Sequence, residues 1–131
     1  MKFQKALLIV FGLISILNGV WMLAFPYHWY WNLPAAVPDT GPFNQHFVRD
    51  IGSAFLTVGV ALVWASIQVQ YAFPLVSLAA LFSVLHACVH IIDMISGRMP
   101  AHHWLLDLPG IYFPAALLIY LTMKTRRHKV P

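Results

Sequence analysis

The stretch ALLIVFGLISILNGVWMLAF, residues 6–25, contains no charged side chain over twenty positions. A helix of about 20 apolar residues is long enough to cross the hydrocarbon core of a bilayer. Comparable apolar runs occupy 51–68, 72–95 and 104–123. These runs are too long and too continuous for the strands of a membrane barrel. The sequence therefore predicts an all-α integral membrane four-helix bundle, with residues 1–131 forming a single transmembrane domain.

The composition excludes several other classes of protein. The chain is 60% hydrophobic and 9% charged, with a mean hydropathy of +0.73, which leaves too little polar surface for a soluble domain. Run 6–25 is too long for the core of a signal peptide, and no small-x-small cleavage pattern follows it. The net charge of +4 has no soluble basic face to act through, so no nucleic-acid partner is expected. The expected partner is the lipid bilayer, and a homo-oligomer or a larger membrane complex stays open.

Lysine and arginine residues predict the orientation, because loops rich in them stay in the cytoplasm. Six of the eight basic residues lie near the termini, at Lys2, Lys5, Lys124, Arg126, Arg127 and Lys129. Four crossings place both termini on one side, so both are expected in the cytoplasm. The connections 26–44 and 96–103 then face outward. The first of these combines aromatic residues with Pro and Gly, which favours a loop or a short interfacial helix followed by turns.

Most of the acidic residues lie beside histidines. Three of the four acids occur in the segments HFVRD (46–50), HACVHIID (86–93) and HHWLLD (102–107), and the chain contains no Glu. Under the predicted topology, all three segments lie at the outward-facing ends of the spans. Ionisable side chains in a membrane are costly, and their default interpretation is functional. These segments are therefore the best candidates for a polar site.

Helical spacing groups these side chains into three stripes, because residues three or four apart share a helix face. The stripes are His46, Arg49 and Asp50; His86, His90 and Asp93; and His103 and Asp107. Facing lipid would leave them unpaired, so we expect all three to point into one pocket between the helices.

Imidazole and carboxylate together suit a transition metal such as zinc, iron or copper. His86 and His90 lie one turn apart and are the best pair for holding one ion from a single helix. The full set of expected metal-site residues is His46, Asp50, His86, His90, Asp93, His103 and Asp107. Arg49 is expected to pair with Asp50 or Asp93, or to receive an anionic group of a substrate. Catalytic residues, and whether the protein is an enzyme with redox or transfer chemistry, stay open.

Two other functions remain open at this stage. A b-type haem or a quinone is one alternative, and haem would require opposed histidines such as His46 with His86 or His90. The other is a non-catalytic accessory subunit, in which the polar groups only lock helices together or dock a larger complex. The sequence contains no nucleophile elbow, phosphate-binding loop, dinucleotide fingerprint or Cys-x-x-Cys motif.

Smaller features predict how the spans pack. Gly52, Ala54, Gly59 and Ala61 mark a small-residue face on the second span, and Asn18 is expected to make a contact between helices. Pro109 and Pro114 are expected to kink the fourth span.

The segment GPFNQHFVRDIG (41–52), with the later His90-x-x-Asp93 and Asp107-Leu-Pro-Gly110, resembles a pattern in small bacterial inner-membrane proteins of unassigned function. Their four-span layout is similar to that of the DoxX-like group. The resemblance implies a multi-pass protein of the bacterial inner (plasma) membrane, with its polar site facing the periplasm. It implies a type of membrane protein and no particular activity.

Overall fold

The computed structural model describes residues 2–126, and every regular element in that range is helical. The elements are α1 (Lys2–Ala24), α2 (Pro26–Asn32), the 3-10 helix η1 (Val37–Thr40), α3 (Gln45–Ile67), the 3-10 helix η2 (Val69–Tyr71), α4 (Ala72–Ile95), α5 (His103–Leu106), the π-helical turn η3 (Leu108–Tyr112) and α6 (Phe113–Arg126). The all-α prediction is therefore confirmed for this range. Arg127 and Lys129, which the topology prediction also used, lie outside the described residues.

Within residues 2–126, three helical segments are long and apolar enough to cross a membrane: Lys2–Ala24, Gln45–Ile67 and Val69–Ile95. The predicted fourth span over 104–123 is divided among α5, η3 and α6, and α6 has only 14 residues, so this segment is not one of the membrane-length helices. A fourth crossing therefore stays a prediction. Proline has no N–H, so Pro109 and Pro114 each remove a rung of the helical hydrogen-bond ladder. The ladder shifts register between them, where Tyr112 N donates to Asp107 O at 3.2 Å. A π-helical turn thus interrupts the helix at the prolines, where the sequence predicted a kink.

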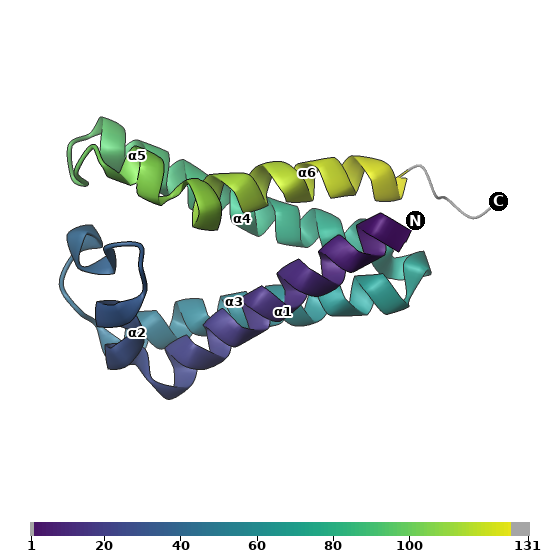
Figure 1. Cartoon of the computed structure of the whole chain (residues 1–131), viewed down its shortest axis with the longest axis horizontal. Coiled ribbons are helices and arrows are strands. Elements are labelled where there is room, and N and C mark those ends of the chain that lie inside the picture. The colour runs from purple at the N-terminus through teal and green to yellow at the C-terminus, as the bar shows by residue number, and fades with distance from the viewer. Residues whose placement is uncertain (1, 127–131) are drawn as a thin grey trace.

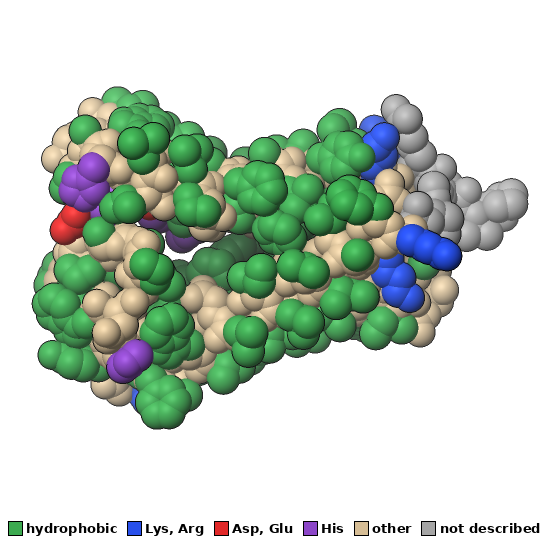
Figure 2. Space-filling model, viewed as in Figure 1, with side chains coloured by type: hydrophobic (Ala, Val, Ile, Leu, Met, Phe, Trp, Pro, Cys, Tyr) green, Lys and Arg blue, Asp and Glu red, His purple; other side chains and the backbone are tan. Residues whose placement is uncertain are grey.

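The long helices form two pairs, α1 with α3 and α4 with α6 (Figure 1). The pairs lie close together at the end that carries the N-terminus and the end of α6, and they separate toward the end that carries α2 and α5. We call the first the Lys end, for Lys2, Lys5 and Lys124, and the second the Asp/His end, for Asp39, His103 and Asp107. In the space-filling view the molecule is hollowed between the pairs, toward the Asp/His end (Figure 2).

Glycine residues allow α1 and α3 to approach closely. A Cβ atom on Gly19 would lie 2.6 Å from the carbonyl oxygen of Gly52, and a Cβ atom on Gly59 would lie 2.6 Å from that of Gly12. These distances leave no room for a side chain at either crossing point. The small-residue face expected on the second span is therefore confirmed at Gly52 and Gly59. Close packing of this kind drives association of helices in a membrane, where apolar burial provides little gain.

The apolar core explains why the two pairs separate at one end. Near the Lys end, one buried cluster joins the two pairs and includes Leu8 of α1, Leu62 of α3, Val76 of α4 and Leu121 of α6. Near the Asp/His end, the second cluster is centred on Met22, Trp29 and Tyr30 and lies within the first half of the chain. Asn18 holds α2 against α1 there, since its Oδ1 accepts from Trp29 Nε1 at 2.9 Å.

Candidate metal site

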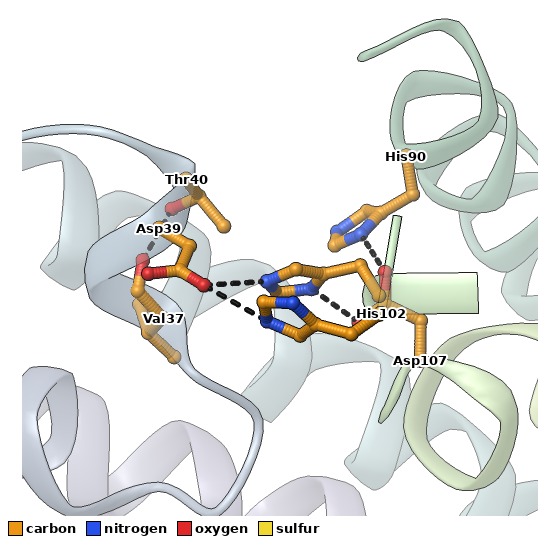
Figure 3. Close-up of polar contacts among 7 residues, drawn as sticks. Val37, Asp39, Thr40, His90, His102 and Asp107 are labelled. Atoms are coloured by element: carbon orange, nitrogen blue, oxygen red, sulfur yellow. Dashed lines mark hydrogen bonds and ion pairs between the residues drawn. The ribbon is translucent and has the colours of Figure 1, made fainter. Parts of the chain in front are cut away.

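The loop that carries Asp39 is anchored to the first half of the chain. Val37 packs against the cluster around Trp29 and Tyr30, and the Tyr30 hydroxyl donates to the carbonyl oxygen of Gly41 at 2.7 Å. Thr40 Oγ1 donates to the carbonyl oxygen of Val37 at 2.7 Å, which closes the turn around the aspartate (Figure 3). These contacts hold the Asp39 side chain at the Asp/His end and direct it toward the second half of the chain.

A tight reversal at the end of α4 brings the other half of the site back against that helix. Arg98 N donates to the carbonyl oxygen of Asp93 at 2.9 Å and Gly97 N donates to that of Met94 at 3.1 Å, which together form a Schellman motif. Gly97 has φ +72, a backbone conformation that glycine adopts without steric cost. The chain then turns into α5, so that His103 and Asp107 lie beside α4.

Asp107 lies at the centre of a polar network between α4 and α5. Its side chain is 2% exposed and accepts from His90 Nδ1 at 2.7 Å through Oδ2 and from His103 Nδ1 at 3.2 Å through Oδ1. A buried carboxylate needs partners of this kind, because an unpaired charge there would be strongly destabilising. Asp107 also precedes η3, but its side chain makes no capping hydrogen bond to the start of that turn.

Asp39 connects this network to the other half of the chain. Its Oδ2 lies 3.1 Å from His102 Nε2 and 3.4 Å from His103 Nε2 (Figure 3). Among residues 2–126, these three side chains form the one group of three whose ligand atoms lie close enough to share an ion, all within 4.8 Å of one another. His103 is fully buried, whereas the His102 side chain is 55% exposed. One side of the group is therefore open to the surroundings.

His103 has a carboxylate oxygen against each of its ring nitrogens. A neutral imidazole can donate from only one nitrogen. If Nδ1 donates to Asp107, the lone pair on Nε2 faces Asp39 Oδ2, and two electron-rich atoms meet. Either a proton on Nε2, which makes the ring an imidazolium that donates to both carboxylates, or a metal cation between the two atoms removes that conflict. A carboxylate behind a histidine is also the usual support for a metal-bound imidazole, because it sets the tautomer and the orientation of the ring.

His86 and His90 form a second contact deeper along α4. Their ring centroids lie 4.8 Å apart, and the His86 ring stacks on Phe82 and meets Phe55 edge-on. His90 Nδ1 is occupied by Asp107. The described residues place no third ligand side chain with this pair, so metal binding by His86 and His90 remains a prediction.

The second-span residues lie apart from this network, so the expectation of one inward-facing pocket is wrong for them. His46 Nε2 contacts Asp50 Oδ2 at 3.3 Å within α3, and the two side chains are 82% and 58% exposed. The helical phase of α3 is decided by Gly52 and Gly59, which must face α1, and this turns the stripe of His46 and Asp50 outward.

The expected pairing of Arg49 with an aspartate is also wrong. Arg49 Nε donates to the carbonyl oxygen of Leu23 at 3.2 Å, at the end of α1. Asp93 instead binds Arg98 Nε at 2.8 Å. Both aspartates therefore have nearer partners, since His46 lies one turn from Asp50 and the Schellman turn returns Arg98 to Asp93.

The sequence interpretation missed two members of the site. Asp39 received no role, and His102 was assigned to a loop. One signal could have found Asp39: it is the fourth acid of a chain with only four, and the predicted topology placed it on the same side as the other three. Of the expected residues, the structure joins His90, His103 and Asp107 directly, with His86 against His90.

No known protein family, curated protein or solved structure matches this chain. The resemblance to the DoxX-like group therefore stays a prediction.

Proposed function

We propose that this chain is a multi-pass protein of the bacterial inner membrane that binds a divalent transition-metal ion at its periplasm-facing end. The ligands are Asp39 Oδ2, His102 Nε2 and His103 Nε2. The observation that carries the proposal is the convergence of these three atoms within 4.8 Å, with Asp107 supporting His103 from behind.

Two imidazoles and one carboxylate suit zinc or iron, and copper is a weaker fit because it favours tetragonal sites. Three protein ligands leave coordination positions open, so a bound ion would be able to polarise a water molecule or a substrate oxygen. The protein supplies the geometry. His90 positions Asp107, Asp107 positions His103, and the exposed edge at His102 leaves a path for the ion.

Metal analysis of the purified, tag-free protein tests this function. We expect about one ion of zinc or iron per chain, and its loss in the His102→Ala and His103→Ala variants. His46→Ala is the matched control, because His46 also contacts an aspartate but lies outside the group. A protein that carries no metal and takes up neither zinc nor iron would contradict the proposal, as would equal loss in the control.

The proposed orientation places both termini in the cytoplasm. It is supported by the basic residues near both termini and by the start of α1 and the end of α6, which lie at the same end of the molecule (Figure 1). The broken segment α5–α6 would then make the fourth crossing. A periplasm-active reporter fused to the C-terminus should therefore give no signal, while the same reporter in the 26–44 connection should be active. A strong signal from the C-terminal fusion would reverse the orientation and place the metal site in the cytoplasm.

A second candidate function is purely structural, and one observation favours it. The two halves of the chain share an apolar core near the Lys end, and the contacts of Asp39 with His102 and His103 join them at the other end. In this case the network is a latch between helix pairs and needs no metal. Asp39→Ala would then lower the unfolding temperature equally with a chelator or with added zinc, whereas a metal site predicts a zinc-dependent difference.

A further inference from the structure

A cavity of about 290 Å³ lies at the Lys end, on the opposite side of the molecule from the candidate metal site. It is formed by the start of α1, the connection between α3 and α4, and the end of α6. The lysines of this end contribute three of its lining residues, Lys2, Lys5 and Lys124. Figure 2 shows Lys and Arg side chains gathered at this end and His and Asp side chains at the other.

Among residues 2–126, no acidic side chain lines this cavity. All four acids of the sequence, Asp39, Asp50, Asp93 and Asp107, belong to the Asp/His end or to the outward ends of α3 and α4. None of the ion pairs found in residues 2–126 involves a lysine. Three like charges around one hollow repel each other, so an anion from outside the chain would be stabilised there.

Helix ends do not decide the potential of this cavity. Both α1 and α4 begin here, but α3 and α6 end here, so partial charges of opposite sign oppose each other. The positive potential therefore comes from the lysines, which favour a ligand with negative charge and several acceptor oxygens.

The wall of the cavity is apolar, which indicates a ligand that has an apolar part as well as a charged group. Leu8, Ala65 and Ala72 line it and belong to the buried cluster that joins the helix pairs. The side of the cavity away from the lysines would suit the upper part of an acyl chain. The combination of a basic rim and an apolar wall between membrane-length helices is the pattern that binds anionic lipid headgroups.

We propose that this cavity, with Lys2, Lys5 and Lys124 at its rim, binds the phosphate group of an anionic phospholipid of the cytoplasmic leaflet. The lysine ammonium groups contact the phosphate oxygens and the apolar wall contacts the start of an acyl chain. The assignment to the cytoplasmic leaflet rests on the proposed orientation of the chain. Lipid binding does not depend on the metal site, which lies at the other end of the molecule.

Thermal unfolding and native mass spectrometry of the full chain in detergent test the proposal with three added probes: phosphatidylglycerol, phosphatidylcholine and inorganic phosphate. We expect phosphatidylglycerol to raise the unfolding temperature saturably and to stay bound in the mass spectrum. Phosphatidylcholine should do neither, although it carries the same acyl chains. Equal stabilisation by inorganic phosphate would assign the cavity to the free anion and overturn the lipid proposal.

Lysine variants give the quantitative test. Lys5→Gln and Lys124→Gln should each weaken phosphatidylglycerol binding about fivefold, in line with the contribution of one basic residue near an anionic membrane surface. Lys5→Arg keeps the charge and should keep binding. Arg98→Gln removes the same charge from the Asp/His end and should have no effect. Unchanged binding in the double Lys5→Gln/Lys124→Gln variant, or equal binding of both lipids, would overturn the proposal. Metal content reports separately on the other site.

Discussion

Replacing Asp107 with Asn removes one charge and almost no volume from the centre of the polar network. The carboxylate accepts from two imidazoles, with its Oδ2 2.7 Å from His90 Nδ1 and its Oδ1 3.2 Å from His103 Nδ1. An asparagine has one accepting oxygen, and its amide group donates. In the variant, one of the two imidazoles would therefore meet a donor where it had an acceptor. Because the shorter contact is to His90, we expect the oxygen to stay with His90 and His103 to lose its support.

The metal should then bind more weakly although every ligand atom is still present. Loss of the group that orients a metal-bound histidine costs about 10- to 100-fold in affinity, which corresponds to about 1.4 to 2.7 kcal/mol. The upper part of this range applies if His103 turns to its other tautomer, because Nε2 would then carry a proton where the ion binds.

The assay is a zinc titration in competition with a chelator of known affinity, performed on the wild type, Asp107→Asn and Asp50→Asn. Asp50→Asn is the same chemical change at a carboxylate that also contacts a histidine but is 58% exposed and outside the group. It should leave the affinity within about twofold, since removing an exposed ion pair has little effect. An unchanged affinity in Asp107→Asn, or an equal fall in Asp50→Asn, would refute the reasoning that Asp107 acts through His103.

Two other predictions follow from the packing and from the ligand set. Gly19→Ala should destabilise the protein by about 1 to 3 kcal/mol, because the added Cβ meets the Gly52 carbonyl oxygen at 2.6 Å. Thermal unfolding in detergent measures this loss. Gly110→Ala is the control, because its added Cβ meets nothing within 4 Å. Zinc affinity should fall as the pH is lowered from about 7.5 to about 5.5, because protons compete with the ion for the imidazole nitrogens of His102 and His103. A titration series over that range checks it, and an affinity independent of pH would contradict imidazole ligation.

Several helix ends could be read from local sequence. The apolar run 72–95 agrees with α4 at both ends, and the end of the helix is set locally, because Gly97 provides the left-handed residue that follows it. Helix α3 begins at Gln45, earlier than the apolar run 51–68 suggested. Its start is nevertheless local, since Asn44 Oδ1 accepts from His46 N and Phe47 N at 3.1 and 3.2 Å. An N-cap of this kind extends a helix into polar sequence that hydropathy alone does not count.

The site was predictable only in part. Helical spacing predicts which residues share a face of a helix, but it does not predict whether that face is turned toward the other helices or outward. The direction of the His46 stripe depends on how α3 packs, and the glycine contacts with α1 turned it outward. His90 instead faces Asp107 at the end of α5, because the turn at Gly97 folds that segment back onto α4.

The sequence by itself determined the helical class, the apolar segments and the break at the prolines of 104–123. It also determined that the acids and most histidines lie toward one end of the molecule. These properties depend on interactions within a few residues and on the cost of placing charge in lipid. Only the tertiary structure decided that Asp39 meets His102 and His103, across 63 and 64 positions of sequence. That contact requires two helix pairs, each held by its own packing, to bring two separate loops together. No local sequence pattern predicts this contact, because the distance between the two loops depends on how all the helices that connect them pack.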